Sequence, residues 1–187
     1  MCCTLDQASQ SDRQTYEECM RRARENNMRR VDLEQDLAEV KKRAVEVWMV
    51  PPETLFGPTP TSGPAQHNAM IMMYKCHYVV FLSSRLVRDG WWPSSLNGVW
   101  AEKFVVFHEY HHAISGEVFA DDPQVRFNLL MRAKRGEAEA AAILGEQEFR
   151  ANDYAAHRVR DNAEQDDNTQ LAADMQRSID KLGLPQT

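Results

Sequence analysis

The sequence predicts an α+β domain that consists mostly of helix. Two amphipathic segments come first, a short stretch with strand character follows, and four helical segments complete the chain. The 187 residues, 43% of them hydrophobic and 27% charged, suffice for a buried core and exclude wholesale disorder or a fibrous repeat. We divide the chain into an N-terminal helical segment, 1–50, a core, 51–160, and a C-terminal amphipathic helix, 161–187.

The N-terminal segment predicts two helices. The first runs from about residue 11 to a break at Asn26 and Asn27, with apolar side chains at helical spacing. The second covers residues 31–49, where Leu33 and Leu37 begin an apolar stripe, and the prolines at 51 and 52 end it. Five of the eight prolines lie between residues 51 and 66, so this stretch predicts a loop.

Residues 69–83 predict two short strands joined near residues 75–77, because apolar, β-branched and aromatic residues dominate there. The next helix opens near Ser95 or Asn97 and ends before Gly116, and another begins at Pro123. The alanine-rich stretch 137–160 predicts a long helix, the acidic run 161–167 a solvated break, and residues 169–182 a last amphipathic helix.

Composition narrows the classes of function. A net charge of −6 argues against a nucleic-acid binder, which needs a basic surface to neutralise phosphates. The sequence has no apolar run of membrane-spanning length, and its first residues lack the pattern of a secretory signal. The four cysteines form no C-x-x-C pair, so we expect reduced thiols in a cytoplasmic protein. Acylation of Cys2 and Cys3, and the oligomeric state, stay open.

The residues that point to a chemical function lie together in the segment His108-Glu109-Tyr110-His111-His112. His108 and His112 are four residues apart, so on a helix they share one face and can bind one zinc ion at about 2.0–2.1 Å. Glu109 lies about 100° round the helix from His108, where its carboxylate can deprotonate a water as the general base. The pattern is H-E-x-x-H on a predicted helix, which indicates a catalytic zinc site.

A catalytic zinc site needs a third protein ligand and an open fourth position. Glu148 is our first choice, because it stands in an otherwise small and apolar stripe of the 137–160 helix, where an isolated carboxylate is costly. Asn152, one turn later, can hydrogen-bond the back nitrogen of a ligating histidine. Glu137, three turns earlier on the same stripe, is the alternative ligand, and Glu139 comes third.

Three segments resemble ImmA/IrrE-type zinc metallopeptidases. Residues 148–156 resemble the E-x-x-A-N-x-F-A-A segment that supplies the third ligand in that family, residues 107–114 its active-site helix, and residues 78–83 the edge strand before that helix. The resemblance implies zinc on His108, His112 and Glu148, with Glu109 as base. It also implies a zincin-like fold, in which a small antiparallel sheet packs on the H-E-x-x-H helix and the Glu-ligand helix.

We therefore expect a zinc-dependent metallopeptidase that hydrolyses a protein or peptide substrate, with residues 78–83 pairing with an extended peptide. His157 could help to stabilise an oxyanion, although a surface position is the simpler interpretation. The alternative is a non-catalytic helical interaction or regulatory protein, in which the metal site is structural or incidental. The substrate and the cleavage preference cannot be read from the sequence.

Overall fold

The computed structural model describes residues 10–31, 45–55, 68–74, 77–115 and 123–182. Over these residues the protein is α+β and rich in helix, with a small mixed sheet of four strands. The chain divides into two compact units, Met1–Gly90 and Trp91–Thr187. The sheet belongs to the first unit and the H-E-x-x-H helix to the second, and the packing of sheet on helix stays a prediction, as does our three-part division of the chain.

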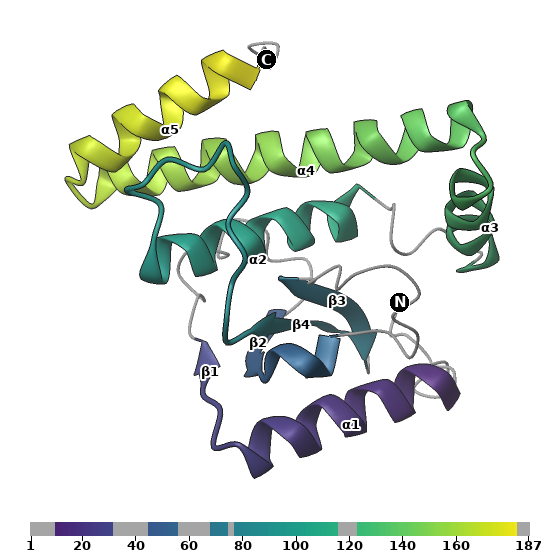
Figure 1. Cartoon of the computed structure of the whole chain (residues 1–187). Helices are drawn as coiled ribbons and strands as arrows, with labels where there is room; N and C mark the ends of the chain where they lie inside the picture. Colours follow the sequence, from purple (N-terminus) through teal and green to yellow (C-terminus); the bar gives the residue numbers. More distant parts are fainter. Residues whose placement is uncertain (1–9, 32–44, 56–67, 75–76, 116–122, 183–187) are drawn as a thin grey trace, which may run out of the picture. The chain divides into compact units, whose positions relative to one another are not determined.

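The first unit combines one described helix with the sheet. Its elements are α1 (Gln10–Glu25), β1 (Arg30–Val31), β2 (Val45–Val50), a 3-10 turn η2 (Pro52–Leu55), β3 (Ala69–Tyr74) and β4 (His77–Ser83). The strand order is β1-β2-β4-β3 (Figure 1). The predicted hairpin is confirmed, since β3 and β4 are antiparallel, but β2 runs parallel to β4, so the sheet is mixed rather than antiparallel.

The expected position of residues 78–83 at a sheet edge is wrong. Strand β4 lies between β2 and β3 and pairs with both over its whole length. Its five residues from Tyr78 to Leu82 are all buried, as is typical of an inner strand of a sheet. Because the backbone groups of β4 are engaged on both sides, this strand cannot pair with a substrate peptide.

The predicted helix over residues 31–49 is also wrong where the structure describes it. Residues 45–50 form strand β2, and Val31 belongs to β1, whereas residues 32–44 lie outside the described ranges. Val45, Val47 and Val50 are β-branched and favour a strand. Pairing with β1 on one side and β4 on the other overrides the helical spacing of the apolar residues.

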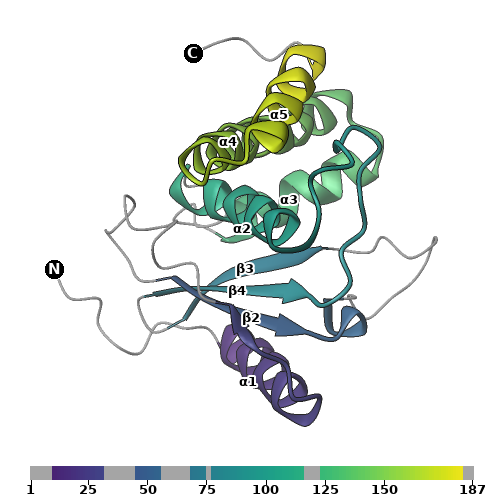
Figure 2. The same cartoon turned by 90° about the vertical axis from the view of Figure 1, so that its left-hand side faces the viewer.

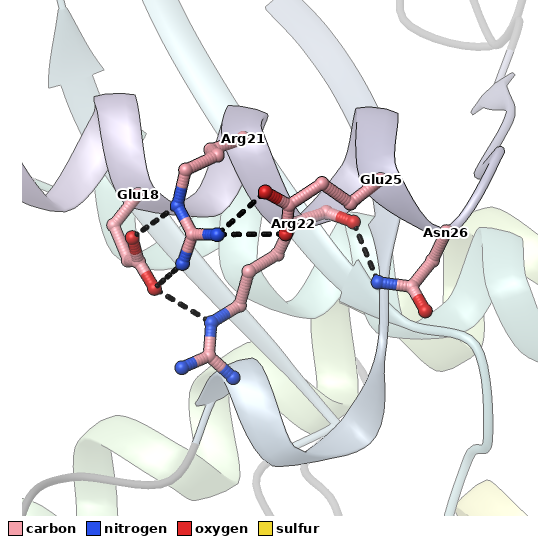
Figure 3. Close-up of polar contacts among 5 residues, drawn as sticks. All are labelled: Glu18, Arg21, Arg22, Glu25 and Asn26. Atoms are coloured by element: carbon pink, nitrogen blue, oxygen red, sulfur yellow. Dashed lines mark hydrogen bonds and ion pairs between the residues drawn. The ribbon is translucent and has the colours of Figure 1, made fainter.

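Helix α1 packs on the sheet through contacts with β2 and β3 (Figure 2). The shared core includes Cys19, Met20, Ala23, Val50, Met72 and Phe81. On the exposed side of the helix, Arg21 donates to both Glu18 and Glu25, and Arg22 also donates to Glu18 (Figure 3). The bonds from Arg21 and Arg22 lower the pKa of the Glu18 carboxyl to about 2, so this charge network persists at neutral pH.

The second unit is built around one long helix. Its elements are α2 (Gly98–Ile114), α3 (Pro123–Lys134), α4 (Ala138–Gln165) and α5 (Thr169–Leu182), which confirms the four predicted helices. Helices α2, α3 and α5 each pack on α4 (Figure 1). These helices can approach α4 closely because the side chains at its contact surface are small. Its fully buried residues include Ala151, Ala155, Ala156 and Ala163. Gly136, with φ of +85°, provides the turn between α3 and α4.

The acidic run 161–167 is not a solvated break over its full length. Helix α4 continues to Gln165, because Asn162 and Ala163 are buried and Arg160 donates to Gln176 of α5. The chain leaves the helix at Asp166, and Asp167 takes a positive φ of 55°. Packing between α4 and α5 therefore extends the helix beyond the point where charge alone predicted its end.

Candidate metal centre

Helix α2 supplies the two histidines of the H-E-x-x-H segment. His112 is buried, with a side chain that is 3% exposed, and His108 is 16% exposed. Their Nε2 atoms lie 3.2 Å apart, one helical turn from each other on the same face, as the spacing predicted. Fully buried neighbours, among them Val106, Phe107 and Tyr110, anchor this part of α2. Both imidazoles are thus held on a rigid helix with their Nε2 atoms converging.

Glu148 of α4 completes a three-residue group. Its Oε2 lies 3.2 Å from His108 Nε2, and its Oε1 lies 3.5 Å from His112 Nε2. One potential ligand atom from each residue lies within 4.8 Å of the other two. Close contact with the imidazoles of His108 and then His112 holds the pKa of the Glu148 carboxyl far below its usual range, so the group is ionised at neutral pH.

The spacing of the three residues matches a tetrahedral cation. In a tetrahedron with bonds of about 2.0–2.1 Å, two ligand atoms stand roughly 3.3–3.4 Å apart. The two Nε2 atoms are 3.2 Å apart, and each faces a different oxygen of the Glu148 carboxylate, at 3.2 Å from His108 and 3.5 Å from His112. Two imidazole nitrogens and one carboxylate oxygen are ligands that zinc accepts, and three protein ligands leave the fourth corner for water or substrate. The donor set and the distances therefore suit Zn²⁺.

The reason for choosing Glu148 from the sequence needs a correction. We expected its carboxylate to point into a core, but the side chain is 53% exposed. Ala140 and Ala151 of α4 are fully buried, whereas every residue between them is exposed or half-buried. Glu148 therefore contacts the two histidines from a stretch of α4 that is largely open to solvent.

Asn152 makes the contact predicted for it. Its Oδ1 lies 2.9 Å from Nδ1 of His108, the nitrogen on the far side of the ring from Glu148. Asn152 and Glu148 are one turn apart on α4, so the same helix contacts both nitrogens of His108. The predicted second contact of His108 is thus confirmed.

The other candidates lie outside this group. Glu137 pairs with Arg132 at 2.7 Å, and Glu139 lies 3.7 Å from the same guanidinium, so neither joins the histidines. His157 faces its own helix, with Nδ1 2.9 Å from a carboxylate oxygen of Asp153. Glu109 is half-buried on α2, next to His108, and is not one of the three residues of the group.

Two aromatic contacts complete the surroundings of the centre. The ring of His111 lies 5.3 Å from that of Tyr154 on α4, so these two side chains pack against each other. Trp91 and Trp92 pack edge-on against Phe104, at 5.4 and 5.1 Å between ring centroids. This cluster supports the start of α2 and is consistent with a role in the core rather than in a substrate groove.

The comparisons with known proteins give no family. No family model, no curated protein and no solved structure matched the chain. Among the residues that the structure describes, no helix meets the length and hydropathy needed for a membrane span. The resemblance to ImmA/IrrE-type peptidases therefore stays a prediction.

Proposed function

We propose that the protein is a zinc-dependent metallopeptidase that hydrolyses peptide bonds of a protein or peptide substrate. The observation that carries the proposal is the meeting of His108, His112 and Glu148 at separations of 3.2–3.5 Å. Two of these residues belong to an H-E-x-x-H segment on one helix, and the third comes from a second helix. This arrangement combines three side chains that zinc accepts as ligands, a fourth corner left for water or substrate, and a carboxylate one residue after His108 that is not a ligand.

When bound, Zn²⁺ supplies Lewis acidity, which polarises a substrate carbonyl and lowers the pKa of a bound water toward ~7. The protein contributes the proton transfers. Glu109 accepts a proton as the water oxygen attacks the carbonyl carbon, and it returns that proton to the amine nitrogen as the C–N bond breaks. Glu109 is half-buried on α2, one residue after His108, and we expect its carboxylate to lie beside the centre.

The test separates metal binding from catalysis. Zinc-loaded protein is incubated with a mixture of unstructured peptides, and the products are identified by mass spectrometry. We expect Glu109→Gln to retain one zinc per chain and to lose about 10²–10⁴-fold of the cleavage rate, because its amide cannot accept the proton. Glu102→Gln, which changes another half-buried carboxylate of α2, is the matched control and should cleave like the wild type.

Two results would refute the proposal: a zinc-loaded wild type that cleaves no peptide, or Glu109→Gln cleavage at the wild-type rate. Stable zinc binding without any cleavage supports the alternative function, in which the metal centre is structural in a non-catalytic interaction or regulatory protein. His112→Ala removes a ligand that is 3% exposed and should abolish zinc binding under either function.

A further inference from the structure

Two residues of α4 contact the ring of His108, and only one of the two is charged. Its Nε2 lies 3.2 Å from the Glu148 carboxylate, and its Nδ1 lies 2.9 Å from the Asn152 amide oxygen. Asn152 is half-buried, and its neighbours Ala151 and Ala155 on α4 are fully buried. A polar contact at such a position is strong, because little water competes with it.

The contact with Asn152 decides which ring nitrogen of His108 can bind a cation. A neutral imidazole carries one N–H, and an amide oxygen only accepts hydrogen bonds. The proton therefore belongs on Nδ1, where it is donated to Asn152, and the lone pair of Nε2 points toward His112 and Glu148. The opposite tautomer would direct an N–H into the position that the ion must occupy.

The charge of residue 152 matters as well. A carboxylate that accepts from a ligating histidine raises the basicity of that ligand, whereas an amide holds the ring without adding charge. With Glu148 as the one anionic ligand, a divalent ion keeps a net charge of +1. A carboxylate at position 152 would offset this remaining positive charge and weaken the attraction of the ion for the oxygen of a substrate carbonyl.

We propose that Asn152 is a positioning residue that orients Nε2 of His108 toward the metal and, being neutral, keeps the ion strongly electrophilic. The first half of this inference concerns metal binding alone, and the second half rests on the proposed peptidase function. The two halves therefore need different measurements.

The experiment measures zinc affinity by competition with a chromophoric chelator for the wild type, Asn152→Ala and Asn152→Asp. We expect Asn152→Ala to weaken binding about 10–100-fold, the usual effect of losing such a partner. Asn152→Asp restores the acceptor and should bind at least as tightly as the wild type, while its kcat on peptides falls roughly tenfold. In NMR spectra of the zinc-loaded protein, a slowly exchanging Nδ1–H of His108 should be present except in Asn152→Ala.

Asn162→Ala is the matched control, because Asn162 is a buried asparagine of the same helix outside the metal centre. Its zinc affinity should equal that of the wild type, even where its thermal stability is lower. The inference is overturned if Asn152→Ala binds zinc like the wild type, or if Asn152→Asp binds as weakly as Asn152→Ala. An unchanged kcat in Asn152→Asp overturns the second half. If no variant cleaves peptide but the order of affinities holds, the proposed function fails and the positioning role stands.

Discussion

Zinc should stabilise the folded second unit, because the three proposed ligand residues lie close together only in the folded chain. The three ligand residues come from α2 and α4, which are far apart in the sequence but pack together in one unit. An unfolded chain cannot keep their ligand atoms at 3.2–3.5 Å, so the ion binds the folded state alone. Any such ligand raises the free energy of unfolding by mass action.

At a free zinc concentration of 100 times the Kd, this stabilisation is about 2.7 kcal/mol. For a cooperative unit of about 100 residues, each kcal/mol shifts the melting temperature by roughly 4–8 °C. Zinc should therefore raise the Tm of the second unit by about 10–20 °C. If both units unfold together, the larger unfolding entropy halves the shift to about 5–10 °C.

The assay is differential scanning calorimetry of metal-free protein with and without added zinc. Glu148→Gln is the informative variant, because its side chain is 53% exposed and the substitution disturbs little packing. A tenfold weaker affinity removes about 1.4 kcal/mol, so the zinc-induced shift should fall to about half. Glu137→Gln, at a carboxylate that pairs with Arg132 instead, is the control and should keep the full shift.

The reasoning is refuted if zinc leaves the Tm of the wild type unchanged, because the three ligand atoms would then not act as one site. It is equally refuted if Glu137→Gln loses the shift and Glu148→Gln keeps it. That outcome would return the role of third ligand to Glu137, the alternative that the sequence had left open.

Three further predictions concern the packing and backbone of the two units. Ala155→Leu should lower the free energy of unfolding in urea by about 1–3 kcal/mol and weaken zinc binding, because Ala155 is fully buried and a larger side chain forces α4 away from its neighbours. Gly136→Ala should lower the free energy of unfolding in urea by about 1–2 kcal/mol, because an alanine is strained at the φ of +85° found there. No atom lies near enough to an added Cβ for a clash, so backbone strain is the whole effect. Burial raises the pKa of the Cys19 thiol to about 11 from an ordinary value of 9.0, so the unfolded chain releases this proton first as the pH rises. Stability should therefore fall between pH 9 and 11 by on the order of 1 kcal/mol per pH unit in the wild type, and Cys19→Ala, compared by urea unfolding across that range, should lack this part of the decrease.

The metal centre shows what local sequence can determine. The i, i+4 spacing of His108 and His112 places two imidazoles on one face of any α-helix, whatever surrounds it. The same spacing links Glu148 to Asn152, so the ligand and the partner of His108 could be predicted as a pair. The boundaries of α2 and α5 were predictable to within a few residues, because capping residues and apolar periodicity are local signals.

Tertiary structure alone decided the rest. Residues 45–49 have helical apolar spacing, yet they form a strand because β1 and β4 supply hydrogen-bond partners that no local pattern reveals. The place of β4 inside the sheet, and with it the loss of an edge for peptide pairing, depends on β2, which comes from an earlier part of the chain. The choice between Glu148 and Glu137 also required the fold, since the sequence predicts both on one stripe of a helix, whereas Glu137 is the N-cap residue of α4. The position at which α2 packs on that helix brings one carboxylate to the histidines and leaves the other to Arg132.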